Sequence, residues 1–144
     1  MISRAIVDSS VAIKWVVDEE DSGSARSISH AVLEAPDLLL IECANILWKK
    51  VALADLSPRE AGDRWQLLLQ APIRFTPSLN LLDAALGIAL DLKHPVYDCL
   101  YLALALQHGV PLITADRKLA AAVKKKKSLG VHVEILSDAG RWKQ

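Results

Sequence analysis

Cysteine and aromatic residues are scarce in this chain of 144 residues, which has two cysteines, one phenylalanine and two tyrosines. Cys43 and Cys99 lie in apolar surroundings and lack the CxxC spacing of zinc or redox sites, so we expect small buried thiols in a reducing compartment and no disulfide framework. The four tryptophans have no repeated spacing, which favours core or interface positions over base-stacking platforms; they are Trp15, Trp48, Trp65 and Trp142.

The chain also lacks net charge and long apolar runs. Lys and Arg together number 17, as do Asp and Glu, so bulk charge does not draw it to a polyanion and any nucleic-acid role must be local. No uninterrupted apolar stretch approaches a membrane span, and residues 1–10 show no long apolar segment with small-residue cleavage signals. We therefore expect a cytoplasmic protein with no membrane association.

Apolar residues, by contrast, are abundant at 52% of the chain, enough for a substantial core in one domain over residues 1–144. Short apolar runs alternate with longer helical patterns, which predicts an α/β fold with a mainly parallel central sheet covered by helices. The expected strands are 5–8, 36–42, 73–75, 111–116 and 131–136. The expected helices are 10–17, 24–35, 42–54, 58–70, 81–92, 94–109 and 117–127.

Local start and stop signals support two of these helices. Ser57, Pro58 and Glu60 place a capping hydroxyl, a proline at the first helical position and a glutamate at the third. Gly109, after His108, is a usual stop signal for the helix over 94–109.

Four acids stand where the strands of such a sheet would end. Asp8 closes the first strand, Glu42 follows the apolar run LLLI at an expected strand-to-helix turn, and Asp116 closes the strand over 111–116. Asp98 lies near the start of an apolar helix just before that strand. Ligands bind outside the carboxyl ends of parallel strands, so these acids are candidates for one site.

Several carboxylates at one place repel one another unless a divalent cation lies between them. All four acids supply hard oxygen ligands, and no His or Cys cluster accompanies them, so the cation would be Mg²⁺ or Mn²⁺. Such a site suits hydrolysis of a phosphodiester by an activated water. Ser9, Ser10 and Thr114 lie within two residues of candidate ligands and could orient them or a bound water.

Each acid also has a purely structural interpretation. Asp8, Asp98 and Asp116 each stand where a short polar side chain could cap the following helix. Glu42 near a helix start could complement the helix dipole. Capping and metal binding are compatible, and the sequence leaves both open.

Four segments around these acids resemble the PIN-domain ribonucleases, most closely the VapC-type toxins of toxin-antitoxin modules. VDSSVAIKWV resembles the opening acid with its small hydroxyl residues, and IECANIL resembles Glu-x-x-Asn-x-Leu. YDCLYLALA resembles Tyr-Asp-Ala-x-Tyr-x-x-Leu-Ala, and ITADRKLA resembles the Thr-x-Asp segment. The four segments occur in the family's order and span nearly the whole chain.

The resemblance implies a PIN-like three-layer sandwich with a central sheet of about five strands covered by helices. It also implies Mg²⁺- or Mn²⁺-dependent endonucleolytic cleavage of RNA, leaving a 5′-phosphate and a 3′-hydroxyl. The implied catalytic and metal-binding residues are Asp8, Glu42, Asp98 and Asp116, with Asn45 supporting Glu42.

The same resemblance implies a small cognate antitoxin that covers the acidic pocket, and a homodimer. Two positions depart from the family pattern. Cys99 replaces a common alanine. Arg117-Lys118 stands where some relatives place another acid, so binding of a second metal ion stays open.

Two further points stay open at this stage. The run Lys124 to Lys127 is either a solvated helix end or a phosphate contact near the acidic pocket. The rival functions are a catalytically silent PIN scaffold and a phosphoacceptor signalling domain, which would want two adjacent acids after the first strand and a lysine after a late strand. Here Asp8 is followed by Ser9, and the four histidines form no general-base or metal pattern.

Overall fold

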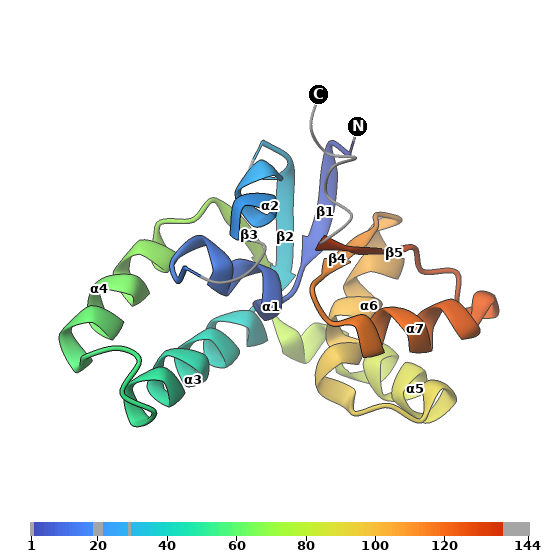
Figure 1. Ribbon diagram of the computed structural model, residues 1–144. Helices are drawn as coiled ribbons and strands as arrows, with labels where there is room; N and C mark the ends of the chain where they lie inside the picture. Colours follow the sequence, from blue (N-terminus) through green and yellow to red (C-terminus); the bar gives the residue numbers. More distant parts are fainter. Residues whose placement is uncertain (1, 19–21, 29, 137–144) are drawn as a thin grey trace.

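A single parallel sheet organises the structure, a computed structural model that describes residues 2–18, 22–28 and 30–136 (Figure 1). Its strand order is β3-β2-β1-β4-β5, and every neighbouring pair is parallel. The strands are β1 Arg4–Val7, β2 Val32–Pro36, β3 Ile73–Thr76, β4 Leu112–Thr114 and β5 Val133–Ile135. The predicted α/β fold with five strands is confirmed.

Helices flank this sheet on both sides (Figure 1). The described α-helices are α1 Ser9–Ala12, α2 Ser22–Ser27, α3 Leu38–Ala52, α4 Pro58–Leu69, α5 Leu82–Leu92, α6 Val96–His108 and α7 Arg117–Lys125. Three short 3-10 helices are η1 Ile13–Trp15, η2 Ser78–Leu81 and η3 Lys127–Leu129. Helix α6 packs on β1, β2 and β4, α1 packs on β4 and α3, and α7 packs on β5.

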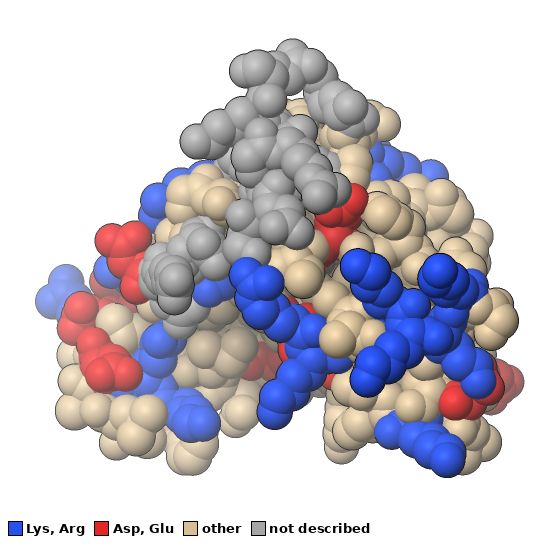
Figure 2. Space-filling model, turned by 45° about the vertical axis from the view of Figure 1, so that its right-hand side comes forward, with Lys and Arg blue, Asp and Glu red and all other residues tan. Residues whose placement is uncertain are grey.

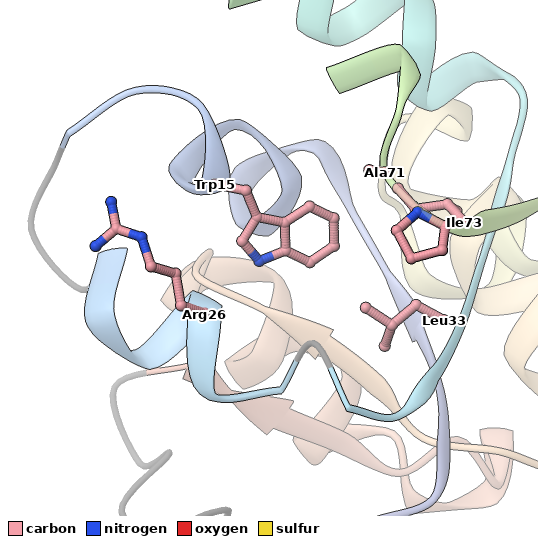
Figure 3. A pocket seen from close by; sticks show the side chains of 6 residues that line it. Trp15, Arg26, Leu33, Ala71 and Ile73 are labelled. Atoms are coloured by element: carbon pink, nitrogen blue, oxygen red, sulfur yellow. The ribbon is translucent and has the colours of Figure 1, made fainter. Parts of the chain in front are cut away.

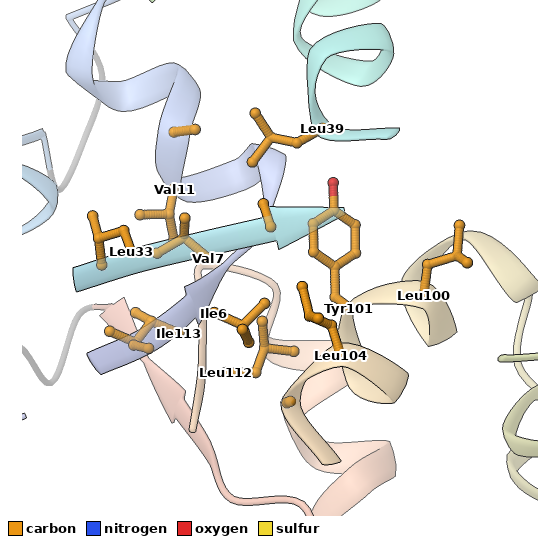
Figure 4. Close-up of a cluster of buried hydrophobic side chains, with 14 of the residues drawn as sticks. Ile6, Val7, Val11, Leu33, Leu39, Leu100, Tyr101, Leu104, Leu112 and Ile113 are labelled. Carbon is orange, nitrogen blue, oxygen red and sulfur yellow. The ribbon is translucent and has the colours of Figure 1, made fainter. Parts of the chain in front are cut away.

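The core lies where α6 meets the sheet. Ile6, Leu104 and Leu112 are fully buried there, and the ring of Tyr101 lies among apolar side chains with its hydroxyl directed toward α3 (Figure 4). Helix α6 is buried over most of its surface, which explains why its sequence is apolar nearly all the way round.

Both cysteines are free and buried, as predicted. Burial raises the pKa of the Cys43 thiol to about 12 and that of the Cys99 thiol to about 11. Since the thiolate is the reactive form, both side chains act as small apolar packing groups.

Trp15 is also part of the packing, and its indole N–H donates to the Ala25 carbonyl oxygen at 2.7 Å. Trp142 lies outside the described residues.

Two element assignments from the sequence were wrong. The expected helix over 24–35 ends at Ser27, and its last part is strand β2, buried between β1 and β3. The expected strand over 36–42 is instead the start of α3, because Pro36 ends the strand. Leu39, Cys43 and Leu47 are buried at four-residue intervals, a helical period that already begins inside the run LLLI.

Other predicted boundaries hold. Ser57 and Glu60 form the capping box of α4, with the Glu60 N–H donating to Ser57 Oγ at 3.1 Å. Gly109 ends α6 with φ of +64°, a left-handed conformation that glycine adopts without steric cost. The helix expected over 10–17 is shorter, with α1 passing into η1 at Ile13.

Candidate active site

The strand order places the candidate site at a point where the chain changes direction within the sheet. From β1 the chain moves outward to β2 and β3, and then crosses back to β4 on the other side of β1. The carboxyl ends of β1 and β4 therefore flank a topological switch point, where ligands bind in open α/β sheets. Asp8 directly follows β1, and Asp116 follows β4 by two residues.

Asp8 is a buried carboxylate held by hydroxyl groups. Its exposed fraction is 5%. Ser10 Oγ donates to Asp8 Oδ1 at 2.5 Å, and Thr114 Oγ1 donates to Asp8 Oδ2. Burial raises the pKa of Asp8 to about 6, although the hydrogen bonds from Ser10 and Thr114 act in the opposite direction. The side chain also accepts from the Val11 N–H at 3.3 Å, so Asp8 caps α1 as well.

Thr114 and Ser10 connect Asp8 to the start of α7. The Asp116 N–H donates to Thr114 Oγ1 at 3.0 Å, and the Ala115 N–H donates to Ser10 Oγ at 2.9 Å. Asp116 itself caps α7, because its Oδ1 accepts from the N–H of Lys118 and Leu119. Ser10 and Thr114 both contact Asp8, and the supporting roles predicted for them in a metal site stay a prediction.

Glu42 lies in the second turn of α3 and is held by a buried tyrosine. Tyr101, fully buried in α6, donates its hydroxyl to Glu42 Oε1 at 2.5 Å. Burial raises the pKa of Glu42, while the hydrogen bonds from Tyr101 and Ser9 lower it. Burial and the nearby Glu42 charge both raise the pKa of Tyr101, so its hydroxyl remains a neutral donor.

Asp98 lies in the first turn of α6, and Pro95 occupies the cap position, so the capping interpretation of Asp98 was wrong. His94 Nε2 lies 2.7 Å from Asp98 Oδ2, where a protonated Nε2 donates to the carboxylate. The negative charge of Asp98 raises the pKa of both Asp8 and Glu42. Three of the four predicted acids are therefore close enough to interact electrostatically.

Two partners of these acids were not assigned from the sequence. The contact of His94 with Asp98 joins residues four apart in the sequence, but His94 precedes the Pro95 cap of α6, so no helical spacing predicts it. Tyr101 stands inside the segment that resembles the family, but its contact with Glu42 joins α6 to α3 across the core. Asn45 is exposed one turn beyond Glu42, and its supporting role stays a prediction.

The chemistry of this donor set fits a hard divalent cation. Within the described parts of the chain, neither Asp8 nor Glu42 forms an ion pair with a lysine or arginine, although burial penalises both charges. Among these same residues, no three His, Cys, Asp or Glu side chains form a ready-made metal cluster. Mg²⁺ keeps several waters and is usually bound through one or two direct carboxylates, so it does not require such a cluster.

Several hollows in the structure are lined by none of these acids. One of about 300 Å³ has mainly apolar walls and lies beside η1, which contributes Trp15 to its lining (Figure 3). It is lined by Trp15, Arg26, Leu33, Ala71, Pro72 and Ile73.

In the described residues, no helix is both long and apolar enough to cross a membrane.

Comparisons with known proteins place this arrangement in a family. The PIN domain model matches residues 5–125. Ribonuclease VapC3 of Pyrobaculum aerophilum is 33% identical over 121 residues, which are 81% of this chain and 92% of that protein.

Solved structures show the same fold. The crystal structure of PAE2754 from Pyrobaculum aerophilum has a TM-score of 0.70 at 21% identity, covering 98% of this chain and 89% of its own. VapC20 of Mycobacterium tuberculosis, described as a sarcin-ricin loop cleaving toxin, has a TM-score of 0.64 at 16% identity, covering 82% and 94%. VapBC2 of Rickettsia felis, bound to a promoter DNA fragment, has a TM-score of 0.61 at 8% identity, covering 92% and 98%. The chain belongs to the PIN-domain family and, within it, to the VapC-type ribonucleases that its sequence resembles.

Proposed function

We propose that this protein is a metal-dependent endoribonuclease that acts as the toxin of a type II toxin-antitoxin pair. The observation that carries the proposal is the buried Asp8 carboxylate at the switch point, electrostatically coupled to Asp98 and without a basic partner among the described residues. The ribonuclease VapC3 relative supports RNA as the substrate class.

Asp8, Glu42, Asp98 and Asp116 would hold Mg²⁺ or Mn²⁺. When bound, the cation would neutralise charge on the phosphodiester and activate a water for in-line attack. Ser10 and Thr114 fix both oxygens of Asp8 by donating to them, and Tyr101 fixes one oxygen of Glu42. These contacts leave the carboxylates in set orientations before the metal ion arrives, which reduces the reorganisation needed for binding.

The decisive experiment is cleavage of a mixed set of structured and single-stranded RNAs with Mg²⁺, Mn²⁺ or EDTA. Wild-type protein should cut in the presence of either metal ion and not in EDTA. Asp98→Asn should reduce cleavage at least a hundredfold, since the amide keeps the shape of the side chain but removes the charge. Asp63→Asn, which changes an exposed carboxylate on α4, is the matched control and should cut like wild type.

The alternative is a catalytically silent PIN scaffold that binds RNA or protein. The presence of all four acids favours the enzyme. If wild-type protein binds Mn²⁺ but cuts no RNA in the set while remaining folded, the scaffold is the better description. If Mn²⁺ does not bind at all, the acidic-site proposal is wrong.

Two partners complete the proposal. A small antitoxin would cover the acidic pocket, and an inserted arginine would pair with its carboxylates. The VapBC2 complex from Rickettsia felis supports a partner of this kind.

A homodimer is supported by large apolar side chains that are exposed along one face of α5, since such surfaces usually mark an interaction site. They are Leu82, Leu86 and Leu90.

A further inference from the structure

A hollow of about 230 Å³ lies at the far end of α7 from the acidic site, between that helix and the segment leading into β5. Its apolar lining comes from Ala120, Val123, Val131 and Val133. Val123 and Ala120 are buried and belong to the inner face of α7. The floor is therefore part of the packed structure, while the opening faces solvent.

The rim of this hollow is basic. Lys124, Lys127 and His132 line it, and both lysines are exposed. Within the described residues neither lysine forms a salt bridge, whereas Lys126 between them pairs with Asp91 of α5 at 3.0 Å. His132 Nε2 contacts Glu134 Oε1 at 2.7 Å, which fixes the ring at the rim. Of the four lysines in the run, Lys126 is held in an ion pair, whereas Lys124 and Lys127 stand beside the apolar floor of the hollow.

Helix α7 connects this hollow to the acidic site. It begins at the Asp116 cap, and Lys118 lies in its first turn. Because an α-helix rises 1.5 Å per residue, Lys124 stands about 12 Å along the axis from Asp116, the reach of a few nucleotides. Figure 2 shows Lys and Arg side chains gathered on this face, with acidic groups visible in the hollowed region beside them.

A site built from carboxylates repels an RNA strand, so cations must hold the strand nearby. We propose that the hollow between α7 and β5 is a nucleotide subsite for the RNA substrate, a few nucleotides away from the scissile phosphate. Lys124 and Lys127 contact the phosphate group there, and the nucleobase packs against Val131 and Val133. This inference rests on the proposed function, whose substrate it positions.

The test measures binding of a fluorescein-labelled single-stranded RNA of twelve nucleotides by anisotropy at several KCl concentrations. Asp98→Asn serves as the background so that the RNA stays intact. Adding Lys124→Gln and Lys127→Gln should weaken binding about tenfold and reduce the salt slope by about 1.4, the loss expected for two single-strand phosphate contacts. Methyl resonances of Val131 and Val133 should shift when RNA is added to the background protein.

The matched control removes two charges elsewhere, through Lys49→Gln at the end of α3 and Arg59→Gln at the start of α4. This control should bind RNA within twofold of the background. Equal weakening by both pairs, or no weakening by the α7 pair, would overturn the subsite. It would also be overturned if the α7 pair loses binding to a co-expressed antitoxin but keeps full RNA affinity.

Cleavage by the wild-type protein separates this inference from the function on which it rests. Wild-type cutting together with unchanged binding by the α7 pair would reject the subsite and keep the nuclease. Binding that depends on Lys124 and Lys127 without any wild-type cutting would keep the subsite and reject the nuclease.

Discussion

Asp8 shows at the scale of one residue why the site is costly without a cation. Its carboxylate is almost completely buried, and hydroxyl donors from Ser10 and Thr114 only partly offset the lost hydration. The pKa rises from 3.8 to about 6, so the folded state favours the protonated acid. An ionised carboxylate buried in this way lowers the free energy of unfolding unless a bound cation compensates its charge.

The first prediction concerns Asp8→Asn in EDTA. Because folding raises the pKa of Asp8, its carboxyl group does not destabilise the folded state at a pH below about 3.8, where it is protonated in both states. The destabilisation grows as the pH rises and is complete above a pH of about 6. We therefore expect Asp8→Asn to raise the free energy of unfolding at pH 7 by about 1 to 3 kcal/mol. The gain should fade as the pH falls from 6 toward 4, as measured by urea denaturation.

In the presence of Mn²⁺ we expect the opposite order of stability, with wild type more stable than Asp8→Asn. If the proposed site binds Mn²⁺, the ion should stabilise the folded wild-type protein by an amount that Asp8→Asn cannot gain. Asp63→Asn, exposed on α4, should follow wild type in both conditions. A loss of stability for Asp8→Asn in EDTA at pH 7 would contradict the argument.

Tyr101 provides a second prediction at this scale. Tyr101→Phe keeps the buried ring but removes the donor to Glu42, so a half-buried carboxylate loses a hydrogen bond. We expect a loss of about 1 to 2 kcal/mol in the free energy of unfolding at pH 7 and weaker Mn²⁺ binding by titration calorimetry. Tyr97→Phe changes an exposed tyrosine on the same helix and should alter neither quantity. Unchanged Mn²⁺ affinity in Tyr101→Phe would show that this contact only supports packing.

At the scale of the element, the start of α7 combines two roles. Asp116 caps the helix through the N–H groups of Lys118 and Leu119, and its backbone N–H is fixed by Thr114 beside Asp8. A cap needs only a short polar side chain, whereas a metal ligand needs the negative charge. The two roles can therefore be separated by substitution.

Asp116→Asn should keep the cap and lose the charge, while Asp116→Ala loses both. We expect the alanine variant to be less stable than the asparagine variant by about 1 kcal/mol, as measured by urea denaturation. Both variants should cut RNA far more slowly than wild type. Wild-type cleavage by Asp116→Asn would assign Asp116 to capping alone.

Elements also differ in how well their sequence predicts them. The α4 start was predictable because Ser57, Pro58 and Glu60 act through contacts within one turn. The β2 and α3 boundary was mistaken, because a short apolar run has no decisive period. Only pairing with β1 and β3 shows that Val32–Pro36 is the strand and that Leu38 begins a helix.

At the scale of the whole molecule, the exposed face of α5 bears on assembly. Leu86 and Leu90 are exposed by 55% and 72%, one turn apart. We expect light scattering to give the mass of two chains for wild type and of one chain for Leu86→Glu combined with Leu90→Glu, since two buried charges oppose a dimer interface. Leu53→Glu, at an exposed leucine after α3, is the control and should remain dimeric. A single-chain mass for wild type would reject the homodimer.

The sequence by itself determined the candidate acids, their hydroxyl neighbours and the α/β class, because these follow from short segments and their periodicity. Tertiary structure decided the rest. Strand order alone brings Asp8 beside Thr114, and packing of α6 on the sheet alone directs Tyr101 onto Glu42. These contacts join residues 59 and 106 positions apart, and no local pattern encodes such a distance. The same folding brings Asp98 near enough to Asp8 and Glu42 for its charge to raise the pKa of both carboxyl groups.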